Sequence, residues 1–167
     1  RRVESNFGNF LADLARELTA TDVALFNGGG FRASIPAGEV RVKDVYQAFP
    51  FGNELVTGTL TGAQIQAALD RSASLDPQDN PGGFLQVSGL RYAITNGTAR
   101  AVTAAGEPLA PAARYRVVLP DFLAEGGDNY LMLKAMEDRV ATGRLISDLV
   151  MEAFRERGAV SVTLDGR

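Results

Sequence analysis

The chain has 167 residues, 46% of them apolar and 22% charged, and it contains no cysteine, histidine or tryptophan. This length is typical of one globular domain that buries about 70% of its unfolded surface around a single core. The missing residue types exclude disulfides, cysteine nucleophiles, imidazole metal ligands and a Ser-His-Asp triad. A net charge of −3 and a pI near 5.0 argue against a nucleic-acid polymer as partner, because phosphate backbones are met by basic surfaces.

The chain shows no stretch of about 18 apolar residues, so the sequence predicts no membrane span. It begins directly on a helical pattern, without the regions of a signal peptide, and we therefore expect an excised or processed piece. Because no repeat, low-complexity tract or composition shift divides it, we expect residues 1–167 to form one domain.

The first predicted helix follows Ser5, a candidate N-cap. Its apolar stripe has helical spacing and consists of Phe7, Phe10, Leu11, Leu14, Ala15 and Leu18. Residues 22–26 then predict a short buried strand that runs into the glycines at 28–30. A second helix is predicted to begin at Thr61, because Gln64 completes a capping box.

The second half of the chain changes to strand patterns after a loop rich in Pro, Gly and Asp at 76–83. Between 84 and 103, Asn96-Gly97 predicts a type I′ turn that joins strands 90–95 and 99–103. Further strands are predicted at 114–119 and 160–164, and a third amphipathic helix lies between them. The helix spans 145–154 and is followed by cationic residues and Gly158.

These elements, about three helices among about six strands with a local hairpin, predict the α+β class. We expect a single domain whose mixed β-sheet core is packed by the helices, rather than a doubly wound parallel fold.

The glycines after the first strand match the loose dinucleotide-binding pattern Gly28-x-Gly30-x-x-Ala33. That pattern binds a pyrophosphate only if a helix starts at its third small residue. Pro36 and Gly38 interrupt the following segment, and no helical stripe follows. No Gly-Lys-Ser/Thr is present either, which excludes a Walker loop. The glycines therefore indicate a turn with positive φ or close backbone approach.

Five segments with distinctive residues follow one another along the chain. They are Arg1-x-x-Glu4-Ser5-Asn6-x-Gly8-Asn9, Asn27–Arg32, Phe49–Asn53, Phe84–Gly89 and Asp121–Tyr130. In this order they strongly resemble the C-terminal domain of the metal-dependent 5′-nucleotidase and UDP-sugar hydrolase family. The resemblance covers essentially the entire chain, and five ordered motifs are far more specific than any single one.

The resemblance implies an active site shared by two domains that move between open and closed forms. An N-terminal metallophosphoesterase domain holds two divalent metal ions and hydrolyses the phosphate ester, while the C-terminal domain grips the nucleoside. This chain contains neither the metal ligands nor the Asn-His pair of that first domain, so we expect no catalytic residue, metal or other cofactor in it. The family also implies a periplasmic, cell-surface or secreted protein.

By motif position, Phe51 and Phe122 resemble the aromatic pair that sandwiches the base. Stacking contributes about 1–3 kcal/mol per base with little base preference. An ordinary core phenylalanine is the alternative interpretation of each residue. Because both lie in segments rich in Pro and Gly rather than on apolar stripes, we favour a binding role.

The remaining candidates are polar. Asp128 resembles the carboxylate that accepts hydrogen bonds from ribose hydroxyls, although an Asp after two glycines is also a common turn former. Arg32 and Arg1 resemble arginines that reach the ribose and phosphate, whereas an isolated arginine is usually a solvated surface residue. Asn27 and Asn53 are weaker candidates for the base edge or ribose, and either side chain can equally bond its own loop.

The sequence departs from the family at Asn129, where glycine is common; asparagine tolerates the left-handed backbone region better than other side chains. The expected function is substrate recognition within an enzyme that converts nucleoside 5′-monophosphates to nucleoside and phosphate. UDP-sugars, 2′,3′-cyclic nucleotides and 3′-nucleotides are alternative substrates, since enzymes for them share this domain. A stand-alone nucleotide-binding module is the alternative outside enzymology.

Overall fold

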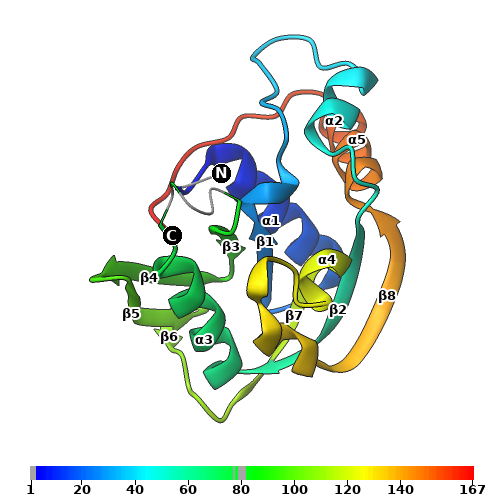
Figure 1. Ribbon diagram of the computed structural model, residues 1–167. Helices are drawn as coiled ribbons and strands as arrows, with labels where there is room; N and C mark the ends of the chain where they lie inside the picture. Colours follow the sequence, from blue (N-terminus) through cyan, green and yellow to red (C-terminus); the bar gives the residue numbers. More distant parts are fainter. Residues whose placement is uncertain (1–2, 77, 79–81) are drawn as a thin grey trace.

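A computed structural model of the protein describes residues 3–76, 78 and 82–167 (Figure 1). Its main sheet has five strands in the order β3-β1-β7-β2-β8. These are β1 (Val23–Asn27), β2 (Glu54–Thr61), β3 (Leu85–Ser88), β7 (Arg114–Pro120) and β8 (Glu137–Leu145). The pair β1 and β7 is parallel and the other pairs are antiparallel, which confirms the predicted α+β class with a mixed sheet.

This pairing brings three chain segments to one edge of the sheet. Because β1 and β7 are parallel, their carboxyl ends point the same way. Strand β2 runs antiparallel to β7, with Leu55 opposite Pro120, so β2 begins where β1 and β7 end. The segments after β1, before β2 and after β7 therefore lie close together.

A second, smaller sheet contains β4 (Leu90–Thr95), β5 (Thr98–Ala104) and β6 (Glu107–Pro108). The turn between β4 and β5 has positive φ at both central residues, 50° at Asn96 and 69° at Gly97. These angles are those of the predicted type I′ hairpin.

The three predicted helices are present as α1 (Asn6–Thr19), α3 (Gly62–Ala73) and α5 (Ile146–Arg157). The Ser5 hydroxyl accepts a hydrogen bond from the backbone N–H of Gly8 at 3.0 Å, as expected for an N-cap. The capping box predicted at the start of α3 is also confirmed. Among the described residues, no helix is long and apolar enough to cross a bilayer.

Alternate residues of the central strands fill two cores, one on each face of the main sheet. In β1, Val23 and Leu25 point to the α3 side, whereas Ala24 and Phe26 point to α1 and α5. Figure 1 shows the small sheet on the α3 side. Burial on both faces explains why the first four residues of β1, 23–26, are all apolar.

The sequence patterns missed α2 (Val42–Ala48), the four-residue helix α4 (Asp121–Ala124) and the three strands β2, β6 and β8. Strand β8 is mostly exposed and polar, so it carries no apolar periodicity. Strand β2 contains Gly58, which weakens a strand pattern. A Cβ on Gly58 would lie 2.5 Å from Cγ of Met136 and 2.8 Å from the carbonyl oxygen of Glu137, so this glycine permits the close approach of β8.

The strand predicted at 160–164 is wrong, because this segment has no strand partner in the described structure. Val160 and Val162 pack against the core of α1 and α5, while Ser161 between them and Leu164 are exposed. The alternation at Val160 and Val162 therefore belongs to a strap over the helices and not to a strand. The strap is held near its end, where the Glu4 carboxylate accepts the backbone N–H groups of Asp165 at 3.2 Å and Gly166 at 3.1 Å.

The predicted loop at 76–83 lies partly outside the described residues. Its described positions, 76, 78, 82 and 83, contain no helix or strand.

The two tyrosines in the α3-side core predict alkaline destabilisation. Burial raises the pKa of Tyr92 to about 12 and also raises the pKa of Tyr130, whose hydroxyl donates to the carbonyl oxygen of Gly83 at 2.6 Å. An unfolded chain ionises its tyrosines near pH 10, so the stabilisation is complete below about pH 10 and is lost as the pH rises through the folded pKa values.

We therefore expect the free energy of unfolding in urea to decline from about pH 10 upward, and Tyr92→Phe to make that decline shallower. The exposed Tyr46 provides the control, since Tyr46→Phe should leave the slope unchanged. If the slope in Tyr92→Phe is unchanged, ionisation of Tyr92 does not contribute to the loss of stability at alkaline pH.

Candidate functional site

The motif residues gather where β1 and β7 end and β2 begins. A 3-10 helix (Gly28–Gly30) follows β1 directly, with no α-helix after it, which confirms that the glycines are not a dinucleotide-binding loop. The turn between α2 and β2 carries Phe51 and Asn53. Helix α4 and a second 3-10 helix (Gly127–Asn129) follow β7.

The two predicted stacking residues are exposed, Phe51 by 59% and Phe122 by 43%. The other seven of the nine phenylalanines are buried or partly buried. Among the described residues, the ring-to-ring contacts connect five of those other phenylalanines and include neither Phe51 nor Phe122. The interpretation of these two residues as core side chains is therefore excluded. Phe122 lies on α4 rather than in a loop.

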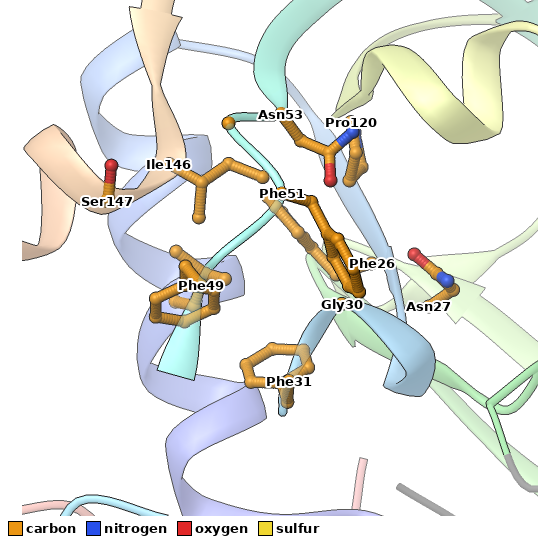
Figure 2. A pocket seen from close by; sticks show the side chains of 12 residues that line it. Phe26, Asn27, Gly30, Phe31, Phe49, Phe51, Asn53, Pro120, Ile146 and Ser147 are labelled. Carbon is orange, nitrogen blue, oxygen red and sulfur yellow. The ribbon is translucent and has the colours of Figure 1, made fainter. Parts of the chain in front are cut away.

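Phe51 covers a small pocket beneath it, which Phe26, Phe31 and Phe49 help to line, and its ring stands beside the side chains of Asn27 and Asn53 (Figure 2). The pocket encloses only about 20 Å³, room for little more than one water molecule. The pocket is therefore too small to hold an aromatic ring.

The guanidinium of Arg32 lies over Phe51, with its Cζ atom 5.5 Å from the ring centroid. This cation–π contact places a positive charge beside the exposed ring. Arg32 also belongs to the segment after β1, whereas Phe51 precedes β2. The contact thus connects two of the three segments at this edge.

Phe122 packs over the backbone of the glycine turn that follows α4. A Cβ built on Gly127 would lie 2.4 to 2.6 Å from three atoms of the ring, so only glycine allows this position of the ring. Gly126, with φ of 82°, and Asn129, with φ of 64°, both have left-handed backbone conformations. Asparagine thus adopts the conformation expected where the family commonly has glycine.

Asp128, held between these residues, also has a left-handed conformation, with φ of 53°. The side-chain Nδ2 of Asn27 donates to Oδ2 of Asp128 at 2.8 Å, and Asn27 is only 5% exposed. Arg71 of α3 donates to the backbone carbonyl oxygen of Asp128 at 3.3 Å. Within the described part of the chain no donor reaches Oδ1 of Asp128. The carboxylate is therefore fixed on one side and available as an acceptor on the other.

Asn53 is held by a second carboxylate, that of Asp121. Its Nδ2 donates to Oδ1 of Asp121 at 2.7 Å, and the same oxygen accepts the backbone N–H of Phe122 at 2.7 Å. Sequence reasoning assigned no role to Asp121 or to Arg71. Asp121 is next to Phe122 in the same motif, so the sequence could have indicated that it belongs to the site. Nothing in the sequence connects Arg71 to Asp128.

Six of the seven predicted site residues thus lie along this edge: Phe51, Phe122, Asp128, Arg32, Asn27 and Asn53. Arg1 lies outside the described residues. The arrangement offers two exposed aromatic rings, a carboxylate acceptor, an amide and a guanidinium. Exposed rings can stack on planar groups, a carboxylate accepts hydrogen bonds from hydroxyls, and a guanidinium pairs with anions.

The described residues do not fit a divalent metal centre. Over 3–76, 78 and 82–167, no group of three or more Asp or Glu side chains is placed to hold a metal ion, and the sequence has no His or Cys.

Comparison with known proteins connects this arrangement to one family. A model of the 5′-nucleotidase, C-terminal domain matches residues 1–135. Over 164 residues, the chain is 29% identical to protein UshA of Escherichia coli, covering 98% of this chain and 30% of that protein. It is 31% identical to the trifunctional nucleotide phosphoesterase protein YfkN of Bacillus subtilis, covering 100% of this chain and 12% of YfkN.

The crystal structure of a 5′-nucleotidase precursor from Thermus thermophilus superposes with a TM-score of 0.89 at 40% identity. The superposition covers 98% of this chain and 35% of the Thermus chain. The chain thus spans less than a third of the length of the curated relatives, UshA and YfkN. Its sequence and fold place it in the 5′-nucleotidase C-terminal domain family.

Proposed function

We propose that this chain is the substrate-recognition domain of a metal-dependent 5′-nucleotidase that hydrolyses nucleoside 5′-monophosphates to nucleoside and phosphate. The observation that carries the proposal is the pair of exposed rings, Phe51 and Phe122, beside the fixed carboxylate of Asp128. The whole enzyme is larger than this chain, as the lengths of its relatives indicate.

The base is proposed to stack between Phe51 and Phe122. Contact of the exposed phenylalanine rings with water is unfavourable. A ligand with a flat apolar face therefore binds more tightly when it covers these rings and removes them from water. Every nucleobase has such a face, which suits broad specificity. Asn53, on the same turn as Phe51 and bonded to Asp121 beside Phe122, is the candidate for a contact with the base edge.

Asp128 is proposed to accept hydrogen bonds from the ribose hydroxyls. Its Oδ1 is available, and Asn27 prevents the carboxylate from turning away. We assign Asn27 mainly this positioning role. Because a hydrogen bond to an ionised acceptor is roughly twice as strong as a neutral one, Asp128 favours nucleosides over simple phosphate esters.

Arg32 and Arg1 are proposed to provide positive charge near the ribose and phosphate. The net charge of the chain is −3, so attraction of an anionic ligand has to come from local arginines. Arg32 already lies beside Phe51, which puts its charge next to the proposed base site.

Hydrolysis is proposed to take place at two divalent metal ions on an N-terminal metallophosphoesterase domain. Closure of that domain over this one would bring the phosphate to the metals and exclude water. We further infer that the enzyme acts in the periplasm, at the cell surface or as a secreted protein, as its family resemblance implies.

A second candidate function is hydrolysis of other nucleotide esters, such as UDP-sugars, 2′,3′-cyclic nucleotides or 3′-nucleotides. The similarity to the trifunctional nucleotide phosphoesterase YfkN favours it. Activity of the full-length protein across these esters distinguishes the two candidates. A full-length protein without phosphoesterase activity would instead indicate a nucleotide-binding module.

We expect Phe51→Ala and Phe122→Ala each to weaken adenosine binding by about 5- to 150-fold, the equivalent of 1–3 kcal/mol of stacking. Binding to the purified chain is measured by NMR titration, which detects weak complexes. Ile94→Ala, an exposed apolar residue on β4, is the control and should bind adenosine normally. Unchanged affinity in both phenylalanine variants would refute the stacking assignment.

Asp128→Asn tests the ribose contact, because asparagine tolerates the left-handed backbone at this position. Loss of the charged acceptor should weaken adenosine binding by about tenfold or more. Affinity for 2′,3′-dideoxyadenosine, which lacks both hydroxyls, should stay unchanged. Equal losses for the two ligands would mean that Asp128 maintains the loop rather than contacting ribose.

The purified chain should release no phosphate from AMP in the presence of Mn²⁺ or Mg²⁺, because it is proposed to lack the catalytic metals. A colorimetric phosphate assay measures this directly. Turnover above background that survives a second purification and is lost in Phe51→Ala would contradict the division of roles between two domains.

A further inference from the structure

We propose that Asp121 is a positioning residue whose carboxylate sets the spacing of the two stacking rings and the orientation of the Asn53 amide. The inference rests on the proposed function, because it concerns how the same site is held ready for a nucleoside. Asp121 is not expected to contact the ligand itself.

One oxygen atom connects the two segments that carry the rings. Oδ1 of Asp121 accepts the side-chain Nδ2 of Asn53 at 2.7 Å and the backbone N–H of Phe122 at 2.7 Å. Asn53 lies two residues after Phe51, and the Phe122 N–H is in the first turn of α4, where backbone donors have no partner within the helix. Both rings are thereby tied to the same acceptor through short stretches of chain.

No other side-chain hydrogen bond in the described structure joins the Asn53 turn to α4. Regular pairing of β2 with β7 ends at Leu55 opposite Pro120, one residue before Asp121. Beyond that point Glu54 still pairs with Leu145 of β8, and the carbonyl oxygen of Asn53 accepts the backbone N–H of Ile146 at 3.0 Å. Toward α4, however, the side chains of Asn53 and Asp121 continue the connection, so this bond links the segment of Phe51 to that of Phe122 beyond the last pair of β2 and β7.

The same bond fixes which way the Asn53 amide faces. An ionised carboxylate only accepts hydrogen bonds, so the amide nitrogen has to face Asp121. The amide oxygen is consequently directed away from Asp121. Any contact of Asn53 with a base edge then uses this oxygen as an acceptor, together with the second N–H as a donor.

The contact is partly buried on both sides, which protects it from competition by water. Hydrogen bonds to an ionised acceptor are roughly twice as strong as neutral ones. Removing the carboxylate leaves two N–H donors without their acceptor but deletes no apolar side chain from either core. We therefore expect a looser site on an intact fold.

The test compares Asp121→Ala and Asp121→Asn in the whole chain by NMR titration with adenosine. Asp121→Ala should weaken adenosine binding by about tenfold or more, as expected when one stacking face is misplaced. Asp121→Asn keeps an acceptor oxygen in the same place and should stay within about threefold of the unchanged chain. Asp148→Ala, which removes a carboxylate from the first turn of α5, is the matched control and should bind normally.

Ribose 5-phosphate, which has no base, distinguishes misplaced stacking rings from a site that is disordered as a whole. Its affinity should be the same in Asp121→Ala and in the unchanged chain, whereas a generally disordered site would lose both ligands. Thermal unfolding of each variant verifies that the fold is intact. The Phe122 amide resonance should also shift in Asp121→Ala without ligand, because that N–H loses its acceptor.

Two outcomes would overturn the inference alone: adenosine binding by Asp121→Ala as tight as by the unchanged chain, or a loss in Asp121→Asn as large as in Asp121→Ala. A loss of ribose 5-phosphate binding equal to that of adenosine would overturn it as well. If the unchanged chain binds no nucleoside, the proposed function fails and the inference fails with it.

Discussion

The pairing of β7 with a parallel β1 on one side and an antiparallel β2 on the other is the constraint on which the site depends. It brings the end of β1, the end of β7 and the start of β2 to one edge of the sheet. Each strand end then contributes side chains: Asn27 at the end of β1 and Arg32 after it, Phe51 and Asn53 before β2, and Asp128 after β7. Irregular segments at the carboxyl ends of buried strands are common places for ligands, because rigid strands position them.

The side chains at this edge have two different roles. Phe51 and Phe122 are exposed and offer apolar surface, which is unfavourable in water unless something covers it. The polar residues are paired with one another, Asn27 with Asp128 and Asn53 with Asp121. These pairs join residues far apart in the sequence and hold the groups that are proposed to face the ligand; such preorganisation reduces the entropic cost of binding.

Such a site needs no reactive group of its own. The chain has no histidine or cysteine, and its described residues form no metal-binding cluster. The composition that excluded several chemistries is consistent with a domain that recognises a substrate and leaves hydrolysis to another. The absence of a side chain at Gly127 leaves room for the Phe122 ring, because any side chain there would displace it.

Much of the fold could be predicted because its signals are local. The stripes of α1, α3 and α5, the Ser5 cap and the Asn96-Gly97 turn depend on residues close in sequence. Strand β8 could not be predicted, because it is an exposed edge strand defined by its partner rather than by its own apolar residues. The segment of Val160 and Val162 shows the reverse case. Its apolar residues alternate as in a strand, but the alternation comes from packing against helices and not from pairing in a sheet.

For the site, the motif order supplied the residues but not their arrangement. The exposure of Phe51 and Phe122 could not be read from the sequence, where most phenylalanines are core residues. The contact between Asn27 and Asp128 spans 101 positions and exists only because β1 and β7 are parallel neighbours. Asp121 acquired a role only when its contact with Asn53 was seen.

The most direct test of the account is an NMR map of the backbone amides perturbed when adenosine is added to this chain. If the edge formed by β1, β7 and β2 binds the nucleoside, the largest shifts will fall on residues 27–32, 51–54 and 121–129. If the largest shifts fall instead on the groove that Arg16, Arg91 and Asp165 line, or if no residue shifts, this edge is not the nucleoside site and the central claim is wrong.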